Sequence, residues 1–350
     1  VIHGTFGEDG TLQKILEAQN MPYTGAGVES SRVAFDKNLA KEKLLASGVP
    51  TPLAEIVDVS QGVRLPEMPV PFVVKPPREG SSVGVHICHD QAELDAATAD
   101  AAQAQVKWGA TNPQRRARVM MEFVRLLNRD MQKLAETLSS EHGKTVPDAK
   151  GDIQRGLEVI EFCIGAPHML KGEFTDSAGP GIDMYSMRQP IGVAAGITPF
   201  NFPAMIPMWK MGPALACGNA FILKPSERAP TVPLMLAALM KEAGLPDGVL
   251  QVINGDKESV DAILDNETIS GIGFVGSTPI AQYIYARGTA TGKRVQCFGG
   301  AKNHMIIMPD ADMDQAVDAL MGAAYGSAGE RCMAISVVVA VGDAGDKLAG

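Results

Sequence analysis

The sequence contains no long run of Lys or Arg and no stretch in which basic and aromatic residues alternate. Its 31 basic residues are outnumbered by 40 acidic ones, which gives a net charge of −9. This balance argues against nucleic acid as a partner. The balance does not exclude small anionic ligands, because helix N-termini and single basic residues bind them locally.

Long apolar runs and a targeting segment are also missing. No apolar stretch reaches the roughly 18 residues of a membrane span, so we expect no membrane partner. The first ten residues, VIHGTFGEDG, have neither the basic nor the hydrophobic region of a signal peptide. They also lack an initiator Met and resemble the end of a strand, so we expect a fragment of a longer protein.

Cysteine is sparse and unpaired in pattern. The chain has 5 cysteines, an odd number, and no CxxC motif. We therefore expect free thiols in a reducing cytoplasm, most of them buried as small hydrophobic residues. The five are Cys88, Cys163, Cys217, Cys297 and Cys332.

What is present indicates an α/β fold. Hydrophobic residues make up 45% of the 350 residues, enough for a globular core, and the length corresponds to roughly two domains. Residues 1–90 suggest short α/β units, and residues 91–107 form an Ala-rich helix. Asn112 caps a helix that begins at Pro113, another helix ends near residue 142, and a third spans residues 153–164. From residue 192 onward, apolar strands alternate with helices, which predicts a mostly parallel, doubly wound sheet. The expected strands are 192–197, 220–224, 250–254, 271–275, 304–308 and 334–341.

A phosphate-binding loop is predicted in the first part. Lys75 ends a short β-rich run, and Ser81 and Ser82 follow in a glycine loop. Glycines let backbone N–H groups approach phosphate oxygens, and the lysine supplies a positive charge. The same letters match the G-x-S-x-G hydrolase motif, but that motif must turn into a helix and here a strand follows.

Together with HGTFGEDG, PYTGAGVESS and Asp36-Lys37, this loop resembles D-alanine–D-alanine ligase, an ATP-grasp enzyme. The resemblance covers residues 1–97 and implies ATP as a ligand. It implies that Lys37, Lys75, Ser81 and Ser82 contact phosphate and that His3 and Glu8 face an amino acid. The lobe that holds magnesium in that family is missing, so we expect no phosphoryl transfer from this segment.

A nucleophilic cysteine is predicted near the C-terminus. Cys332 follows Arg331 in the small-residue loop GSAGERCMA, and a neighbouring cation favours a reactive thiolate. Asn201 lies between two phenylalanines in TPFNFPAM, where its amide can donate a hydrogen bond to an oxyanion. The alternative role for Asn201 is a turn cap.

With FILKPSERAP, VINGD, FVGST and GGAKNH, these motifs resemble the aldehyde dehydrogenase superfamily, and its CoA-acylating members most. The resemblance covers residues 98–350 and implies an incomplete aldehyde dehydrogenase fold, in which a Rossmann-like parallel sheet follows N-terminal helices. It implies Cys332 as nucleophile and Asn201 as oxyanion donor. It places NAD on Thr198, Pro199, Phe200, Lys224, Ser226, Glu227, Gly255, Gly276 and Ser277.

The resemblance also implies a reaction. The Cys332 thiolate attacks an aldehyde, the thiohemiacetal gives a hydride to NAD, and a thioester results. Hydrolytic members use a Glu to activate water, but residues 296–300 contain no carboxylate, so we expect CoA as acceptor. Arg155 and Arg331 resemble the grip on a substrate carboxylate, although Arg155 fits a solvated helix face equally well.

The two resemblances together suggest a fusion of two incomplete enzymes joined inside the Ala-rich helix. We expect the missing C-terminal region to impair activity and to disrupt the family oligomer. Alternatives are an incomplete ligase and a non-catalytic nucleotide-binding remnant. No metal site is predicted: Asp310-Ala311-Asp312 begins like a calcium loop, but Gln315 stands where a glycine is needed, so a helix cap is favoured.

Overall fold

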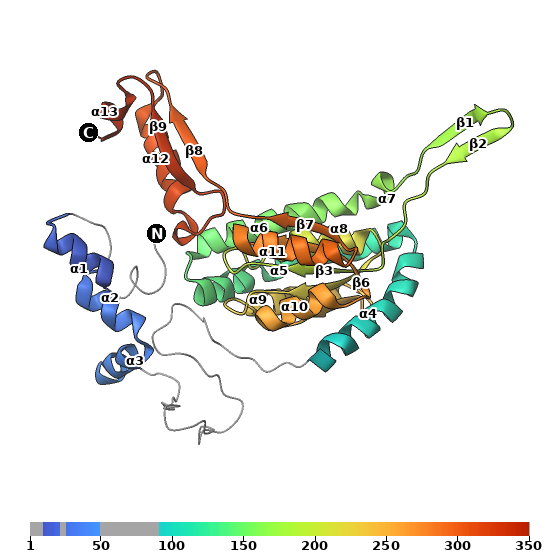
Figure 1. Ribbon diagram of the computed structural model, residues 1–350, viewed down its shortest axis with the longest axis horizontal. Coiled ribbons are helices and arrows are strands. Elements are labelled where there is room, and N and C mark those ends of the chain that lie inside the picture. Colours follow the sequence, from blue (N-terminus) through green and yellow to red (C-terminus); the bar gives the residue numbers. More distant parts are fainter. Residues whose placement is uncertain (1–9, 22–25, 50–90, 350) are drawn as a thin grey trace. The chain divides into compact units, whose positions relative to one another are not determined.

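A computed structural model describes residues 10–21, 26–49 and 91–349 (Figure 1). The chain divides into two compact units, Val1–Ile87 and Cys88–Gly350. Five residues with predicted roles lie outside the described residues, as does Cys88. These five are His3, Glu8, Lys75, Ser81 and Ser82.

The described part of the first unit is helical. It contains α1 (Thr11–Ala18), α2 (Val28–Phe35) and α3 (Lys37–Ala46). The Asp36 carboxylate accepts a hydrogen bond from the Leu39 amide at 3.2 Å and so caps α3. Lys37 is the first residue of this helix.

The second unit begins with long helices. They are α4 (Gln91–Ala110), α5 (Pro113–His142), α6 (Val146–Ile164) and the short α7 (Ala166–Met169). The predicted cap is confirmed, because Asn112 Oδ1 accepts from the Gln114 amide at 2.8 Å. The prediction of two helices between residues 113 and 143 is wrong: one 30-residue helix fills the interval.

The Ala-rich helix α4 packs on the core of the second unit. Its residues Leu94 and Ala101 are buried in a cluster with the sheet, and Trp108 joins a second cluster with α5 and α8. The sequence predicted that two enzyme segments are joined inside α4. From Leu94 onward, however, the packing of this helix shows no break.

A five-stranded parallel sheet with the order β5-β4-β3-β6-β7 forms the centre of this unit (Figure 1). Alternate residues of β4 face two different cores: Phe221 and Leu223 pack with α5, α8 and α9, whereas Ala220 and Ile222 pack with α4, α10 and α11. The predicted doubly wound sheet is thus confirmed. The strands are β3 (Val193–Ile197), β4 (Ala220–Lys224), β5 (Leu250–Val252), β6 (Ile269–Val275) and β7 (Arg294–Phe298), and the helices between them are α8 (Met205–Ala216), α9 (Thr231–Glu242), α10 (Lys257–Asp265) and α11 (Thr278–Ala290).

Two smaller sheets were not predicted as such. Strands β8 (Asn303–Ile307) and β9 (Ile335–Ala340) form a two-stranded parallel sheet and are connected through α12 (Met313–Tyr325); α13 (Ala344–Ala349) follows β9. The helix cap predicted at Asp310-Ala311-Asp312 is confirmed, because Asp312 Oδ1 accepts a hydrogen bond from the Gln315 amide at 3.0 Å and so caps α12.

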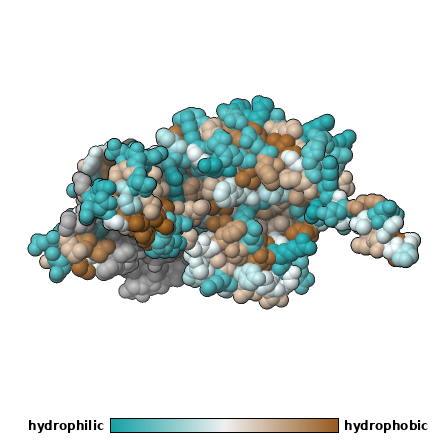
Figure 2. Space-filling view, turned by 90° about the horizontal axis from the view of Figure 1, so that it is seen from above, coloured by the Kyte–Doolittle hydropathy of each residue, from teal (hydrophilic) through white to brown (hydrophobic). Residues whose placement is uncertain are grey.

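Strands β1 (Phe174–Gly179) and β2 (Ile182–Tyr185) form an antiparallel hairpin. It projects from the rest of the second unit (Figures 1 and 2). Its side chains are exposed, including those of Phe174, Ile182 and Met184.

Among the residues that the structure describes, no helix combines the length and apolar character needed to cross a bilayer. The same residues contain no group of three His, Cys, Asp or Glu side chains placed to hold a metal ion.

Helices α6 and α8 pack closely because residue 156 is a glycine, which has no side chain. Substitutions at two glycines of α6 test this packing. A Cβ added at Gly156 would collide with the Met208 methyl and lie 3.1 Å from the Met205 Cα, whereas one added at Gly151 meets nothing within 4 Å. We expect Gly156→Ala to lower the free energy of unfolding by about 1–3 kcal/mol through overpacking. Gly151→Ala should raise it by about 0.5–1 kcal/mol through helix propensity. Urea denaturation measures both, and equal shifts would contradict the packing account.

Candidate functional site

The predicted cofactor residues meet at one edge of the sheet. Because the five strands are parallel, their carboxyl ends lie together, and this edge at a change in strand order is where α/β sheets bind ligands. Thr198 directly follows β3, and its amide donates to the Lys224 carbonyl at 3.0 Å, at the end of β4. Gly276 follows β6, and its amide donates to the Phe298 carbonyl at 3.1 Å, at the end of β7.

A lysine–glutamate pair occupies the end of β4. Lys224 Nζ lies 3.4 Å from the Glu227 carboxylate, and the lysine is 5% exposed. Burial lowers the pKa of Lys224, while Glu227 and Asp256 act in the opposite direction. Ser226 is also buried, and its hydroxyl accepts from the Arg228 amide at 3.3 Å. Lys224, Ser226 and Glu227, which are predicted to contact NAD, thus follow one another at the end of β4.

Glycines and a helix N-terminus complete this edge. Gly255 has φ +146°, and a side chain there would collide with Ser259. Ser277 is the N-cap residue of α11, but its hydroxyl makes no capping hydrogen bond. The N–H groups at the start of this 13-residue helix therefore form a site for an anion such as a pyrophosphate.

Two buried polar atoms at this edge have no hydrogen-bond partner among the residues that the structure describes. They are the Thr198 hydroxyl, in a residue that is 3% exposed, and the Asn254 Oδ1. Such atoms are rare in folded proteins and call for a partner. A polar ligand with hydroxyl and phosphate groups would supply one, so these residues fit a dinucleotide.

Cys332 lies in a strained loop between α12 and β9, which we call the nucleophile loop (residues 326–332). Ser327, Ala328 and Gly329 follow one another with φ between 56° and 73°, a region that side chains disfavour. Consecutive strain of this kind persists only where surrounding contacts hold it, and it concentrates at functional sites. Cys332 itself is exposed.

The nucleophile loop contacts the segment that carries Asn201. The Asn201 side-chain amide Nδ2 donates to the Glu330 carbonyl at 2.6 Å, while its Oδ1 is buried without a partner. From β8, the Asn303 amide donates to the Cys332 carbonyl at 3.4 Å and to Ala334 at 3.2 Å. The structure therefore brings Asn201 into contact with the loop that bears Cys332.

Phe200 lies beside the same loop. Its ring stacks on that of His142, with centroids 6.1 Å apart, and the Arg228 guanidinium lies 4.9 Å from the Phe200 centroid. His142 Nε2 in turn lies 3.1 Å from the Glu330 carboxylate. Pro199 connects Phe200 to Thr198, so the segment joins the cofactor edge to the nucleophile loop.

A buried ion pair that sequence reasoning missed supports this segment. Lys144 Nζ lies 3.2 Å from Asp152 Oδ2 and donates to the Asn201 carbonyl at 2.7 Å. Asp152 Oδ1 accepts from the Met205 amide at 2.7 Å. Burial lowers the pKa of Lys144 and raises that of Asp152, and their attraction opposes both changes. The sequence did contain one sign of this pair, because Asp152 stands beside Ile153 on the apolar face of α6.

The two arginines predicted to hold a carboxylate differ in their surroundings. Arg331 Nη2 lies 3.1 Å from Asp148, inside the site. The Arg155 side chain is 70% exposed and pairs with Glu158 at 3.0 Å. The geometry of Arg155 matches the solvated helix face that the sequence left open, and its role in binding stays a prediction.

Residues 296–300 correspond to the segment that is predicted to carry the general base in hydrolytic members. The part of this segment that lies on β7 has no carboxylate side chain. Gln296 accepts a hydrogen bond from Lys210 Nζ at 3.0 Å, and Cys297 is half-buried and packs toward the cluster with α10 and α11. Burial raises the pKa of the Cys297 thiol, although Lys210 lowers it in part.

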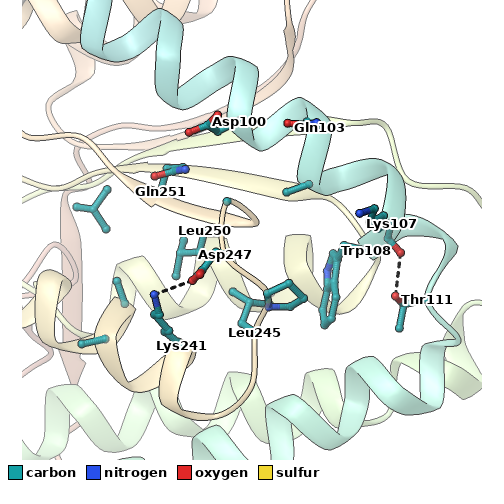
Figure 3. A pocket seen from close by; sticks show the side chains of 16 residues that line it. Asp100, Gln103, Lys107, Trp108, Thr111, Lys241, Leu245, Asp247, Leu250 and Gln251 are labelled. Atoms are coloured by element: carbon teal, nitrogen blue, oxygen red, sulfur yellow. Dashed lines mark hydrogen bonds and ion pairs between the residues drawn. The ribbon is translucent and has the colours of Figure 1, made fainter.

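A large groove lies away from this site. It runs along the edge strand β5 between α4 and the segment after α9, with a volume of about 900 Å³ (Figure 3). Lys241 and Asp247 form an ion pair of 2.7 Å across it. No residue with a predicted role lines it, so its size alone does not make it the functional site.

Comparison with known proteins now assigns the family. Residues 70–349 match the model of the Aldehyde dehydrogenase family. The chain belongs to this family. The match begins at residue 70 and so includes Lys75, Ser81 and Ser82, which the sequence analysis assigned to a ligase segment. The comparisons give that ligase resemblance no support, and the boundary at residue 97 stays a prediction.

Three similar proteins illustrate the match. Malonate-semialdehyde dehydrogenase of Pseudomonas aeruginosa is 59% identical over 245 residues, which cover 70% of this chain and 49% of the relative. The mitochondrial, acylating methylmalonate-semialdehyde dehydrogenase of Arabidopsis thaliana is 50% identical over 252 residues, covering 72% and 42%. A Sinorhizobium meliloti structure complexed with NAD is 67% identical with a TM-score of 0.74, covering 76% of this chain and 54% of that one. The chain thus spans about half the length of the curated relatives it matches.

The surroundings of the cysteines predict their order of alkylation. Cys332 is exposed, whereas Cys163 is buried and its pKa is raised by burial to about 12. Cys217, which we expected to be buried because it lies on an apolar stretch of the sequence, is half-buried. Iodoacetamide at neutral pH should therefore label Cys332 first and Cys163 last, because the thiolate is the reactive form. Peptide mapping measures the order, and uniform labelling would contradict it.

Proposed function

We propose that this chain carries the cofactor and nucleophile sites of an NAD-dependent, CoA-acylating dehydrogenase of malonate- or methylmalonate-semialdehyde. The observation that carries the proposal is the contact between the Asn201 amide and the nucleophile loop that bears Cys332. Names of similar proteins support the aldehyde class, and one of them is described as acylating.

The cofactor residues at the sheet edge are proposed to bind NAD. The start of α11, with Gly276 and Ser277, would hold the pyrophosphate, and Lys224 with Glu227 would hold the adenosine ribose. When bound, NAD accepts a hydride. The Glu227 carboxylate accepts hydrogen bonds from ribose hydroxyls and would repel a 2′-phosphate, so we propose NAD rather than NADP.

Cys332 is proposed as the nucleophile. Its sulfur adds to the aldehyde carbon, and the resulting oxyanion needs a donor. The Asn201 Nδ2 is such a donor, and the Glu330 carbonyl occupies it in this structure. This nitrogen carries two N–H groups, so the one that does not donate to Glu330 is proposed to donate to the oxyanion. Loss of hydride then leaves a thioester on Cys332.

A thiol is proposed as the acyl acceptor. Hydrolysis of a thioester needs a base that activates water, and neither Gln296 nor Cys297 is a carboxylate. CoA brings its own nucleophilic sulfur and needs no such base. Arg331 is proposed to contact the carboxylate of the substrate through guanidinium donors other than the Nη2 atom that lies against Asp148.

The experiment follows products with and without CoA. The chain is incubated with NAD and malonate semialdehyde, and both NADH and acyl-CoA are measured. We expect acyl-CoA in amounts equal to NADH, and only one turnover per chain when CoA is omitted. Steady NADH formation without CoA would show that water is the acceptor and would overturn the acylating part of the proposal.

Two cysteine variants identify the nucleophile. Cys332→Ala should abolish NADH formation because no thiohemiacetal forms, whereas Cys297→Ala should retain most of it. The reverse result, with activity lost only in Cys297→Ala, would assign the reaction to the other thiol.

A further inference from the structure

The nucleophile loop is attached to α6 through one carboxylate. Asp148 lies in the first turn of that helix, and it contacts the loop at two separate points. Its Oδ2 accepts from the Ser327 amide at 3.1 Å, and its Oδ1 lies 3.1 Å from Arg331 Nη2. Ser327 begins the strained turn and Arg331 precedes the nucleophile, so the two contacts bracket the loop.

Asp148 is itself held in place. The Thr145 hydroxyl accepts from the Asp148 amide and donates to the Asp148 carboxylate, both at 3.3 Å. The position at a helix N-terminus also favours its negative charge. These contacts fix the backbone and the side-chain orientation of Asp148 independently of its contacts with the loop.

The loop needs such an attachment. Left-handed backbone at Ser327 and Ala328 costs free energy that other contacts must offset. Arg331 also crosses closely over Gly326, where an added Cβ would lie 2.7 Å from Nη2. The arginine can therefore reach Asp148 only while the turn keeps this conformation, which couples the two contacts.

We propose that Asp148 is a positioning residue, which holds the nucleophile loop in its strained conformation and thereby places Cys332 against Asn201. This inference depends on the proposed function only in taking Cys332 as the nucleophile. Asp148 touches neither cofactor nor aldehyde in this role; it acts through Ser327 and Arg331.

The test uses the full chain and three variants on one helix. Asp148→Ala removes both contacts, Asp148→Asn keeps an oxygen acceptor but removes the charge, and Glu161→Ala is the control, since Glu161 is exposed on the same helix. Hydrogen exchange by mass spectrometry is followed in peptides that contain residues 326–332. This readout needs no NAD, CoA or aldehyde, so it is independent of the proposed function.

We expect exchange at Ser327 to be about tenfold faster in Asp148→Ala, because a hydrogen bond to a charged group is lost. Asp148→Asn should be intermediate and Glu161→Ala unchanged. Should Asp148→Ala fail to fold, Asp148→Asn alone decides. Wild-type exchange in Asp148→Asn, or acceleration spread evenly over all peptides, would overturn the proposal.

A kinetic readout separates positioning from general structure. In the active enzyme, Asp148→Asn should lower kcat about tenfold and leave the KM for NAD unchanged, because the sheet edge that holds NAD is not altered. Equal changes in both quantities would indicate a structural role and contradict the proposal.

Discussion

A lysine and an aspartate buried against each other hold the site together. Lys144 stands between α5 and α6, and Asp152 lies one turn beyond Asp148 on α6. Between them they bind both ends of the Asn201 segment, through the Asn201 carbonyl and the Met205 amide. The two charges are costly to bury, and each is tolerated because the other and these backbone groups satisfy it. The ion pair thus holds the Asn201 segment, where the helical layer meets the sheet edge, in a fixed position.

From this point the site extends in two directions. Toward the sheet, Thr198 continues the hydrogen bonding of β3 and β4 and begins the row of polar residues that fits a dinucleotide. Toward the surface, Asn201 and Asp148 contact the nucleophile loop, which leads into β9 of a separate small sheet. A rigid sheet edge and a strained loop are therefore joined through one short segment. This segment thus links the predicted cofactor residues of the sheet edge to the loop that bears Cys332.

The sequence predicted the elements of this fold better than their contacts. Apolar strands alternating with helices were sufficient for the doubly wound sheet, but β7 was missed because Arg294 and Gln296 interrupt its apolar residues. Local motifs predicted roles for Cys332 and Asn201, and the structure brings Asn201 into contact with the loop that bears Cys332. Asp148 and Lys144 could not be recognised locally, since their function depends on residues far along the chain: Arg331 for Asp148 and Asn201 for Lys144. Charged residues buried by tertiary packing leave little trace in a local pattern.

The most direct test of this account separates the stability that the buried pair provides from the positioning that it provides. Asp152→Ala should lower the free energy of unfolding by about 3–5 kcal/mol, because Lys144 is left buried and unpaired. The double variant Lys144→Met with Asp152→Leu should recover most of that stability, since apolar residues of similar volume replace both charges. Hydrogen exchange at the Met205 amide is then the deciding measurement. The account predicts that exchange stays fast in the double variant, because the acceptor for this amide is gone. Exchange at the wild-type rate in the stable double variant would contradict the claim that the pair fixes the Asn201 segment.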